Sequence, residues 1–280
     1  MRLPTVLLTI ILAITTLSCT KESGTFTDEV LNSYTPIKRQ GADNNFCWAY
    51  AMLAAIETEN ISKGDSVHLS VAWISKMTES DPRAPKSCRG VAGTLLNSLE
   101  RYGIVPFNQM PTTDDPLPSE VILEGETLTP LEYAARVSPP GYYIGLGSTS
   151  SVPEGEEFVA PFPDNWEDNT LLNMEMDSIL KTTETAVRGG RGVCWEGDIS
   201  ERGFKREKGV ARIGLIGGKT SDNHCMAIVG IARDSKGKPY FIMKNSWGTK
   251  NPYGGLFYMS YPYFMRKTVA VYLPKDCLTL

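Results

Sequence analysis

Histidine is scarce in this chain: its 280 residues include only two, His68 and His224. The sequence also lacks a Cys-x-x-Cys pair and a His-Glu-x-x-His run, which are common spacings of zinc ligands. A metal site built from cysteine and histidine is therefore a weak hypothesis. We expect a function that needs no metal and no organic cofactor.

Long runs of one charge are also missing. The chain carries 28 basic and 32 acidic residues, with a formal net charge of -4, and no basic stretch stands out. This distribution argues against a nucleic-acid partner. Hydrophobic residues make up 41% and charged residues 21% of the chain, which is typical of a compact globular protein and excludes a disordered or collagenous one.

No hydrophobic run reaches the roughly 20 residues that a membrane-spanning helix needs. The apolar stretch Val6–Leu17 is shorter, follows the positive Arg2 and precedes Ser18-Cys19, as in an export signal. We expect residues 1–18 to be a signal peptide and Cys19 to be the lipidated first residue of a bacterial lipoprotein, periplasmic or on the cell surface. Plain secretion is the alternative, because Thr16 stands where lipoproteins usually have an aliphatic residue.

After the signal we expect a tether over residues 19–33 and one domain over residues 34–280, active as a monomer. Apart from Cys19 and Cys47, the chain has four further cysteines, Cys88, Cys194, Cys225 and Cys277. Four cysteines allow three pairings, and the sequence leaves open both the pairing and the presence of free thiols.

Helices dominate the first part of the domain. Residues 46–59 are rich in Ala, Met, Leu and Ile without Gly or Pro, which predicts a buried helix that Asn44 or Asn45 can cap. A second helix is predicted to begin at Ser70, and a third to cover residues 94–102. Residues 105–168 are dense in Pro, Gly and acidic residues, so we expect connecting structure there, followed by a polar helix over residues 171–188.

The last third of the chain changes to short apolar runs between turns. These runs lie at residues 192–196, 225–230, 240–244, 255–259 and 269–272, and they predict strands. Helices followed by strands indicate an α+β fold with two lobes, a helical N-terminal lobe and a C-terminal lobe formed by an antiparallel sheet or barrel.

Cys47 is predicted to lie in the first turn of the helix over residues 46–59. Unpaired backbone N–H groups and the positive end of the helix dipole lower the pKa of a thiol at this position and can also bind an oxyanion. An inert, buried cysteine is the commoner outcome for an isolated residue. Cys47 alone therefore does not establish a nucleophile.

His224 and Asn245 make the nucleophile more plausible. A reactive thiol needs a base, and His224 opens a predicted strand directly after Ser221-Asp222-Asn223, whereas His68 precedes a predicted helix and fits a structural role. Asn245 follows the strand over residues 240–244, where its amide can accept a hydrogen bond from an imidazole and orient the ring.

In order along the chain, these segments resemble the motifs of papain-like cysteine peptidases: Gln40-Gly41, Cys47-Trp48-Ala49-Tyr50, Asn223-His224-Cys225-Met226-Ala227 and Lys244-Asn245-Ser246-Trp247-Gly248. Other segments look like the bleomycin hydrolase and aminopeptidase C branch: Leu128-Thr129-Pro130-Leu131-Glu132-Tyr133, Tyr142-Tyr143-Ile144 and Gly192-Val193-Cys194-Trp195-Glu196. Catalytic residues in this family follow the order cysteine, histidine, then asparagine along the chain.

The resemblance implies hydrolysis of peptide bonds, with Cys47 as nucleophile, His224 as base and Asn245 orienting it. It further implies that Gln40 completes an oxyanion hole and that Trp247 shields His224. The resemblance also implies that the substrate is bordered by Gly90 and by the two neighbours of His224, which are Asn223 and Cys225. One extra residue separates Gln40 from Cys47 relative to the family, so Asn44 or Asn45 is an alternative oxyanion donor.

The sequence leaves two questions open. It does not choose between an endopeptidase and an aminopeptidase acting on peptides or proteins. The alternative class is an inactive papain-like lipoprotein that binds peptides without cleaving them, although such a protein has no need to retain Cys47, His224 and Asn245.

Overall fold

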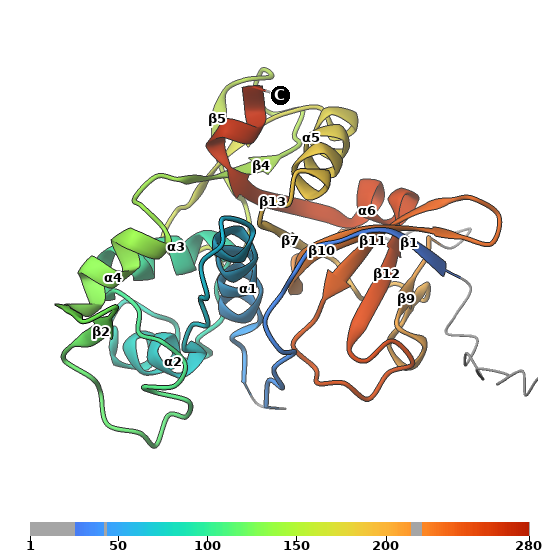
Figure 1. Ribbon diagram of the computed structural model, residues 1–280. Helices are drawn as coiled ribbons and strands as arrows, with labels where there is room; N and C mark the ends of the chain where they lie inside the picture. Colours follow the sequence, from blue (N-terminus) through green and yellow to red (C-terminus); the bar gives the residue numbers. More distant parts are fainter. Residues whose placement is uncertain (1–25, 42–43, 214–219, 280) are drawn as a thin grey trace, which may run out of the picture.

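The computed structural model describes residues 26–41, 44–213 and 220–279. The predicted signal peptide and Cys19 lie outside these residues. The helices of the N-terminal part gather on one side of the molecule and most strands on the other, and the helix α1 (Cys47–Ser62) lies between them (Figure 1). The two-lobed α+β architecture expected from the sequence is confirmed.

The first lobe contains α1, α2 (Val71–Ser80), α3 (Ala92–Tyr102) and α4 (Pro130–Val137). As predicted, Ser70 caps α2, with its hydroxyl accepting a hydrogen bond from the backbone N–H of Trp73 at 3.1 Å. The cap of α1 differs from the prediction. Phe46 occupies the cap position and makes no side-chain capping bond, while Asn44 Oδ1 accepts from the Phe46 N–H at 2.9 Å instead.

The second lobe is built around one large sheet, whose strands follow the order β5-β6-β4-β13-β7-β10-β11-β12-β9-β8, with β1 paired to β10. Two pairings, β4 with β6 and β12 with β9, are parallel. The remaining pairings that the structure describes in this sheet are antiparallel. Its strands are β1 (Phe26–Leu31), β4 (Tyr143–Gly147), β5 (Glu157–Val159), β6 (Thr170–Asn173), β7 (Val193–Gly197), β8 (Phe204–Lys205), β9 (Val210–Ala211), β10 (His224–Asp234), β11 (Pro239–Lys244), β12 (Leu256–Ser260) and β13 (Thr268–Pro274).

Three expectations need correction. Part of the predicted tether, Phe26–Leu31, is the strand β1, which adds to the sheet beside β10. The region expected to be connecting structure holds α4, β4, β5 and a hairpin of β2 (Val121–Leu123) and β3 (Glu126–Leu128). The polar helix begins later than predicted, as α5 (Met176–Arg188), because the residues before it extend and pair with β4 and β5.

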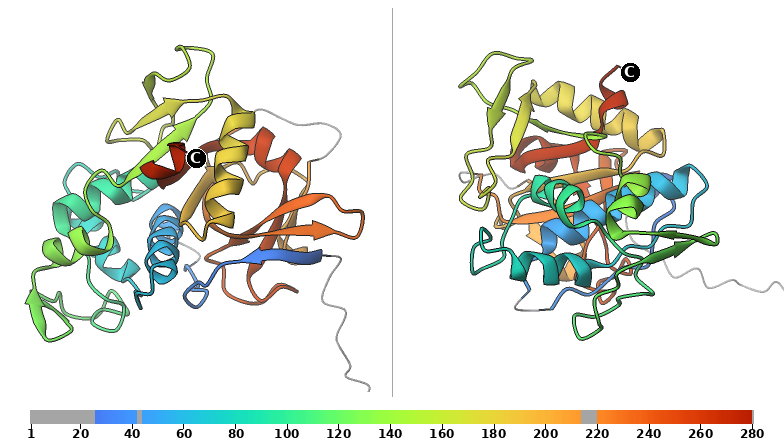
Figure 2. Two further views of the ribbon diagram at one scale, coloured as in Figure 1. Left: turned by 45° about the horizontal axis from the view of Figure 1, so that its top comes forward. Right: turned by 90° about the vertical axis from the view of Figure 1, so that its left-hand side faces the viewer.

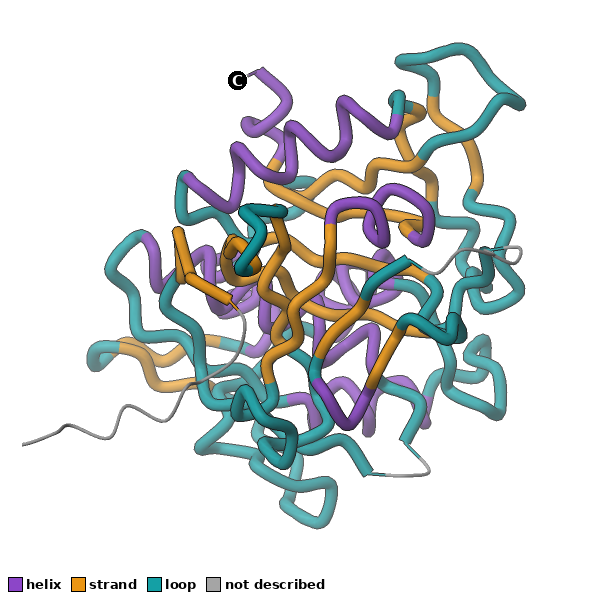
Figure 3. The backbone as a smooth tube through the Cα atoms, turned by 90° about the vertical axis from the view of Figure 1, so that its right-hand side faces the viewer, coloured by secondary structure: helices purple, strands orange, loops and turns teal. Residues whose placement is uncertain are grey.

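Alternating side chains give the sheet two apolar faces. In β7, Cys194 faces the core shared with α1, whereas Trp195 faces a second core against α5 and α6 (Tyr261–Lys267). In β10, Cys225 likewise faces the core shared with α1, and Met226 faces the second core. Figure 2 shows α5 and α6 on one side of the sheet, and in Figure 3 the strands lie in front of the first-lobe helices. The cysteine of β10 is therefore directed toward α1.

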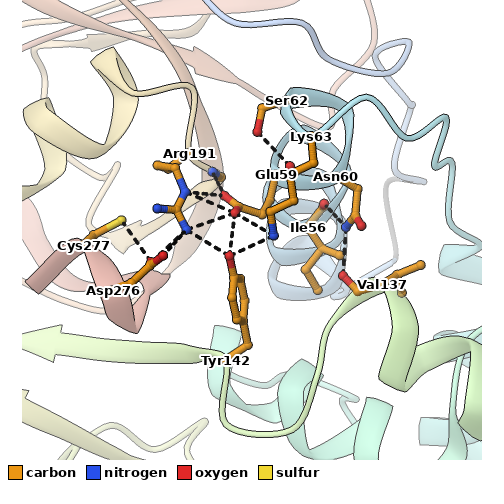
Figure 4. A network of polar contacts seen from close by, with 11 residues as sticks. Ile56, Glu59, Asn60, Ser62, Lys63, Val137, Tyr142, Arg191, Asp276 and Cys277 are labelled. Carbon is orange, nitrogen blue, oxygen red and sulfur yellow. Dashed lines mark hydrogen bonds and ion pairs between the residues drawn. The ribbon is translucent and has the colours of Figure 1, made fainter.

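A buried polar network fixes the C-terminal end of α1 to the second lobe (Figure 4). Glu59 is 1% exposed and accepts hydrogen bonds from Arg191 Nε at 3.1 Å and from the Gly192 backbone N–H at 2.8 Å. Arg191 also pairs with Asp276 at 2.7 Å, in the terminal 3-10 helix η2 (Lys275–Thr279). Removing one partner of a buried ionic contact is strongly destabilising, so this network fixes α1, and with it Cys47, relative to the sheet.

Within the described residues, no helix has the length and apolar character to cross a membrane.

Candidate active site

Cys47 is the first residue of α1. The first N–H groups of a helix have no partner inside the helix, so they point toward the thiol and toward any anion bound there. Hydrogen bonds from Cys225 and from His224 lower the pKa of the Cys47 thiol well below its usual range, against the opposing effect of burial. The structure thus gives Cys47 the surroundings of a reactive thiolate.

Cys225 also acts on the thiol of Cys47. Burial raises the pKa of its thiol well above the usual range, and the neighbouring Cys47 adds to that shift. Cys225 is 3% exposed. It therefore stays protonated and donates a hydrogen bond to the Cys47 thiolate, a role that its position next to His224 did not reveal in the sequence.

His224 begins β10, and Asn245 directly follows the neighbouring strand β11. The antiparallel register of these strands brings the two side chains together, with His224 Nε2 at 2.9 Å from Asn245 Oδ1. The same Oδ1 accepts a hydrogen bond from the Ser246 backbone N–H at 2.7 Å. Because that atom must be an acceptor, Nε2 of His224 carries the proton, which leaves Nδ1 for Cys47.

Trp247 covers this histidine. Its ring stacks on His224 with centroids 4.6 Å apart, and Phe257 meets the indole edge-on at 5.8 Å. The hydrogen bond between His224 and Asn245 is consequently sheltered from water, with both residues no more than 4% exposed. A low local dielectric strengthens such a bond.

Gln40 lines the same pocket as Cys47, and both ends of its side-chain amide are held by hydrogen bonds. Ser246 Oγ donates to Gln40 Oε1 at 2.9 Å, and Gln40 Nε2 donates to the Asn44 carbonyl. A side-chain amide nitrogen has two hydrogens, so one remains for an oxyanion. Of the alternative donors, Asn45 uses its Nδ2 on the Ser87 carbonyl at 2.9 Å.

A pocket of about 170 Å³ joins these groups to the rest of the predicted site. Gly90 is packed closely, since a Cβ there would lie 3.2 Å from both Thr94 Oγ1 and the Trp48 ring. Asn223 is held by Asp198, which accepts from its Nδ2 at 2.9 Å. The lining residues are Gln40, Asn44, Asn45, Cys47, Arg89, Gly90, Asp164, Asp222, Asn223, His224 and Cys225.

An acid pair beside the thiol was missed from the sequence. The carboxyl groups of Glu196 and Asp222 share a hydrogen bond. Burial raises the pKa of Glu196 well above its usual range and raises the pKa of Asp222 to about 6, with the charge of Cys47 adding to both shifts. Glu196 also accepts from the Ala92 N–H at 2.9 Å. The strand β7, the helix α3 and the residues before β10 meet only in the folded chain. No spacing of residues in the sequence therefore predicts this pair.

The other histidine, His68, has packed surroundings that fit a structural role. The ring of His68 stacks on Phe107 with centroids 4.4 Å apart, and burial lowers its pKa. Among the described residues the five cysteines Cys47, Cys88, Cys194, Cys225 and Cys277 are free thiols. The disulfides that the sequence left open therefore do not form between them.

Part of the chain matches a known protein family. Residues 188–269 match the family model of the papain family cysteine proteases, a range that includes His224 and Asn245 but not Cys47. No curated protein gives a match.

Solved structures share the fold across most of the chain. PepW from Lactobacillus rhamnosis is 15% identical with a TM-score of 0.66, covering 90% of this chain and 82% of PepW. Procathepsin L 3 from Tenebrio molitor is 18% identical with a TM-score of 0.55, covering 92% and 72%. A structure from a study of the mite allergens Blo t 1 and Der p 1 is 19% identical with a TM-score of 0.57, covering 92% and 73%. The papain-like fold is confirmed, whereas the bleomycin hydrolase branch stays a prediction.

Proposed function

We propose that this chain is a cysteine peptidase that hydrolyses peptide bonds through a thioester on Cys47. The observation that carries the proposal is the arrangement of three side chains: Cys47 and His224 line one pocket, and His224 Nε2 is held at 2.9 Å by Asn245 Oδ1. A thiolate at a helix N-terminus, a base and a group that orients the base are the parts that nucleophilic catalysis requires.

The reaction proceeds in two halves. The Cys47 thiol passes its proton to Nδ1 of His224, and the thiolate then attacks the carbonyl carbon and forms a carbon–sulfur bond, while the carbonyl oxygen becomes an oxyanion. The Cys47 backbone N–H and the free hydrogen of Gln40 Nε2 stabilise that oxyanion. His224 then gives the proton on Nδ1 to the departing nitrogen as the carbon–nitrogen bond breaks. A water molecule, deprotonated by Nδ1 of His224, attacks the thioester and releases the acid and the free thiolate.

The test uses the folded chain and an epoxide warhead on a short peptide. The proposal predicts one adduct on Cys47, found by mass spectrometry, and no adduct in Cys47→Ala. Cleavage of a peptide library then distinguishes an endopeptidase from an aminopeptidase. A folded chain that is labelled on Cys47 but cleaves no peptide would support the alternative of a peptide-binding protein.

We also propose that the chain is exported and held at a membrane by a lipid on Cys19. Supporting this are the apolar stretch Val6–Leu17 and the Ser18-Cys19 pair. Since β1 begins at Phe26, the tether is shorter than the predicted 19–33, and its maximum reach is roughly 20 to 25 Å. Metabolic labelling with a fatty acid tests the proposal: label should enter the chain and be lost in Cys19→Ser.

A further inference from the structure

A second pocket adjoins the candidate active site on the other side of Trp247. It has a volume of about 510 Å³ and shares Gln40 with the pocket of Cys47. Trp247 forms one wall with its indole, which also stacks on His224. Its lining residues are Ile37, Arg39, Gln40, Arg206, Glu207, Trp247, Gly248, Thr249, Lys250, Asn251 and Phe257.

Positive charge predominates in this pocket. Three cationic side chains, Arg39, Arg206 and Lys250, line it together with the single anion Glu207. All four are exposed, and across residues 26–41, 44–213 and 220–279 the ion pairs found involve none of them. With three cations against one carboxylate, the pocket keeps an excess of positive charge that can bind an anion.

The cations stand on well-fixed backbone. Arg39 pairs with Trp247 in an antiparallel bridge, and the Gly248 N–H donates to the Lys38 carbonyl at 3.1 Å. The turn after Lys250 is closed by Asn251, whose Oδ1 accepts from the Gly255 N–H at 2.7 Å. The guanidinium of Arg206 lies over the Trp247 ring at 4.3 Å, a cation–π distance. Fixed backbone and a stacked side chain reduce the entropy lost on binding.

The position of the pocket indicates which half of a peptide reaches it. His224 delivers its proton to the departing nitrogen, so the amine half of the substrate lies next to His224. Trp247 covers His224 and continues into the basic pocket. The residues that follow the scissile bond therefore pass over Trp247 toward Arg206 and Lys250.

We propose that this basic pocket binds a carboxylate carried by the amine half of the substrate, either an Asp or Glu side chain or the C-terminal carboxylate. The inference rests on the proposed function for the direction of the peptide. It assigns a substrate class to the chain: peptides that carry negative charge shortly after the cleaved bond.

Binding to the full chain carrying Cys47→Ala tests this separately from catalysis. A random pool of acetylated hexapeptides, made once with C-terminal amides and once with free carboxylates, is passed over the immobilised protein, and retained peptides are quantified by mass spectrometry. Enrichment of Asp and Glu in the amide pool identifies a side-chain carboxylate. Stronger retention of the free-acid pool identifies the C-terminal carboxylate.

The variants Lys250→Gln and Arg206→Gln should each weaken this selection by about two- to fivefold, the range expected for one exposed ion pair, and salt should weaken it further. Lys236→Gln is the matched control, because it removes one exposed charge at the turn between β10 and β11, outside the pocket. The proposal would be overturned if acidic and neutral peptides were retained equally in both pools. It would also be overturned if Lys250→Gln and Arg206→Gln both selected carboxylates as strongly as Lys236→Gln does. Carboxylate selection by a chain that cleaves nothing would refute the proposed function alone.

Discussion

Asn245 Oδ1 holds His224 Nε2 at 2.9 Å while it also accepts from the Ser246 backbone N–H at 2.7 Å. The second bond fixes which way the Asn245 amide points. It thereby determines the histidine tautomer, with a proton on Nε2 and Nδ1 directed to Cys47. The orientation of the base is thus set by the backbone that follows β11.

Asn245→Ala removes the acceptor for Nε2. We expect kcat to fall by about fivefold, in line with the net worth of roughly 1 kcal/mol for one hydrogen bond, with a smaller change in KM. Asn245→Gln, which carries the same amide on a longer side chain, should not restore the rate. Steady-state kinetics on one peptide substrate checks this, and an unchanged kcat in Asn245→Ala would show that Asn245 does not orient His224 for the reaction.

Gln40→Ala removes the proposed oxyanion donor. Loss of one such donor costs about 100-fold in kcat or more. Ser246→Ala is the matched control, since it deletes only the hydroxyl that donates to Gln40 Oε1 at 2.9 Å, and we expect a loss of less than about tenfold. If both variants lose the same activity, the donor comes from another group, with Asn44 the first candidate.

Asp222→Asn tests the acid pair through the pH dependence of Cys47. The Asp222 carboxyl has a pKa of about 6, raised first by burial, so it is negative above that pH and disfavours the neighbouring thiolate. Neutralising it should lower the pKa of Cys47 and move the rise of alkylation rate to lower pH, by roughly half a unit. The pKa of Asp222 also depends on Arg89, Asp164 and Glu196. The proteins are therefore compared at the same ionic strength, so that these charges are screened equally.

Glu196→Gln provides the control for that experiment. Burial raises the pKa of Glu196 well above its usual range and so favours the neutral carboxyl, which means that the substitution removes less charge near Cys47 than Asp222→Asn does. We expect a much smaller change in the alkylation profile. A profile that moves to higher pH in Asp222→Asn would show that the carboxylate stabilises the thiolate instead.

The sequence predicts the site better than it predicts the surroundings of the site. Short motifs that open and follow two strands reveal His224 and Asn245, and composition reveals the buried helix of Cys47. Glu196 and Asp222 give no such signal, because β7 and the residues before β10 become neighbours only through strand pairing. The strand β1 resembles a tether because its side chains are mostly exposed, so an edge strand of this kind has no hydrophobic alternation to reveal it.

Asp198 should make the stability of the fold depend on acid. Its pKa is lowered to about 2: burial acts against this shift, and hydrogen bonds from Ser200, Asn223 and Lys267 produce it. A carboxyl whose pKa is depressed in the folded state stabilises it fully above the unfolded pKa, near 3.8, and this stabilisation is lost as the pH falls toward 2. Asp198→Asn should therefore lower the free energy of unfolding at pH 7 by about 1 to 2 kcal/mol, with the difference shrinking in acid.

Urea unfolding of both proteins at pH 7 and pH 3 measures this difference. Because Asp198 also accepts from Asn223 Nδ2 at 2.9 Å, directly before His224, we expect the same variant to lose some activity while it remains folded. A difference in stability that grows toward acid would contradict the assigned direction of the pKa shift.

The activation of the Cys47 thiol by His224 is tested by the rate at which a peptide epoxide alkylates Cys47, measured by mass spectrometry from pH 4 to pH 9. In the unaltered chain we predict fast labelling of Cys47 alone, with half of the maximal rate reached well below the ordinary thiol pKa. In His224→Ala we predict that the rise moves toward that ordinary pKa. Labelling of Cys47 that is slow at neutral pH in the folded chain, or that has the same pH dependence in both proteins, would show that Cys47 is not a thiolate activated by His224.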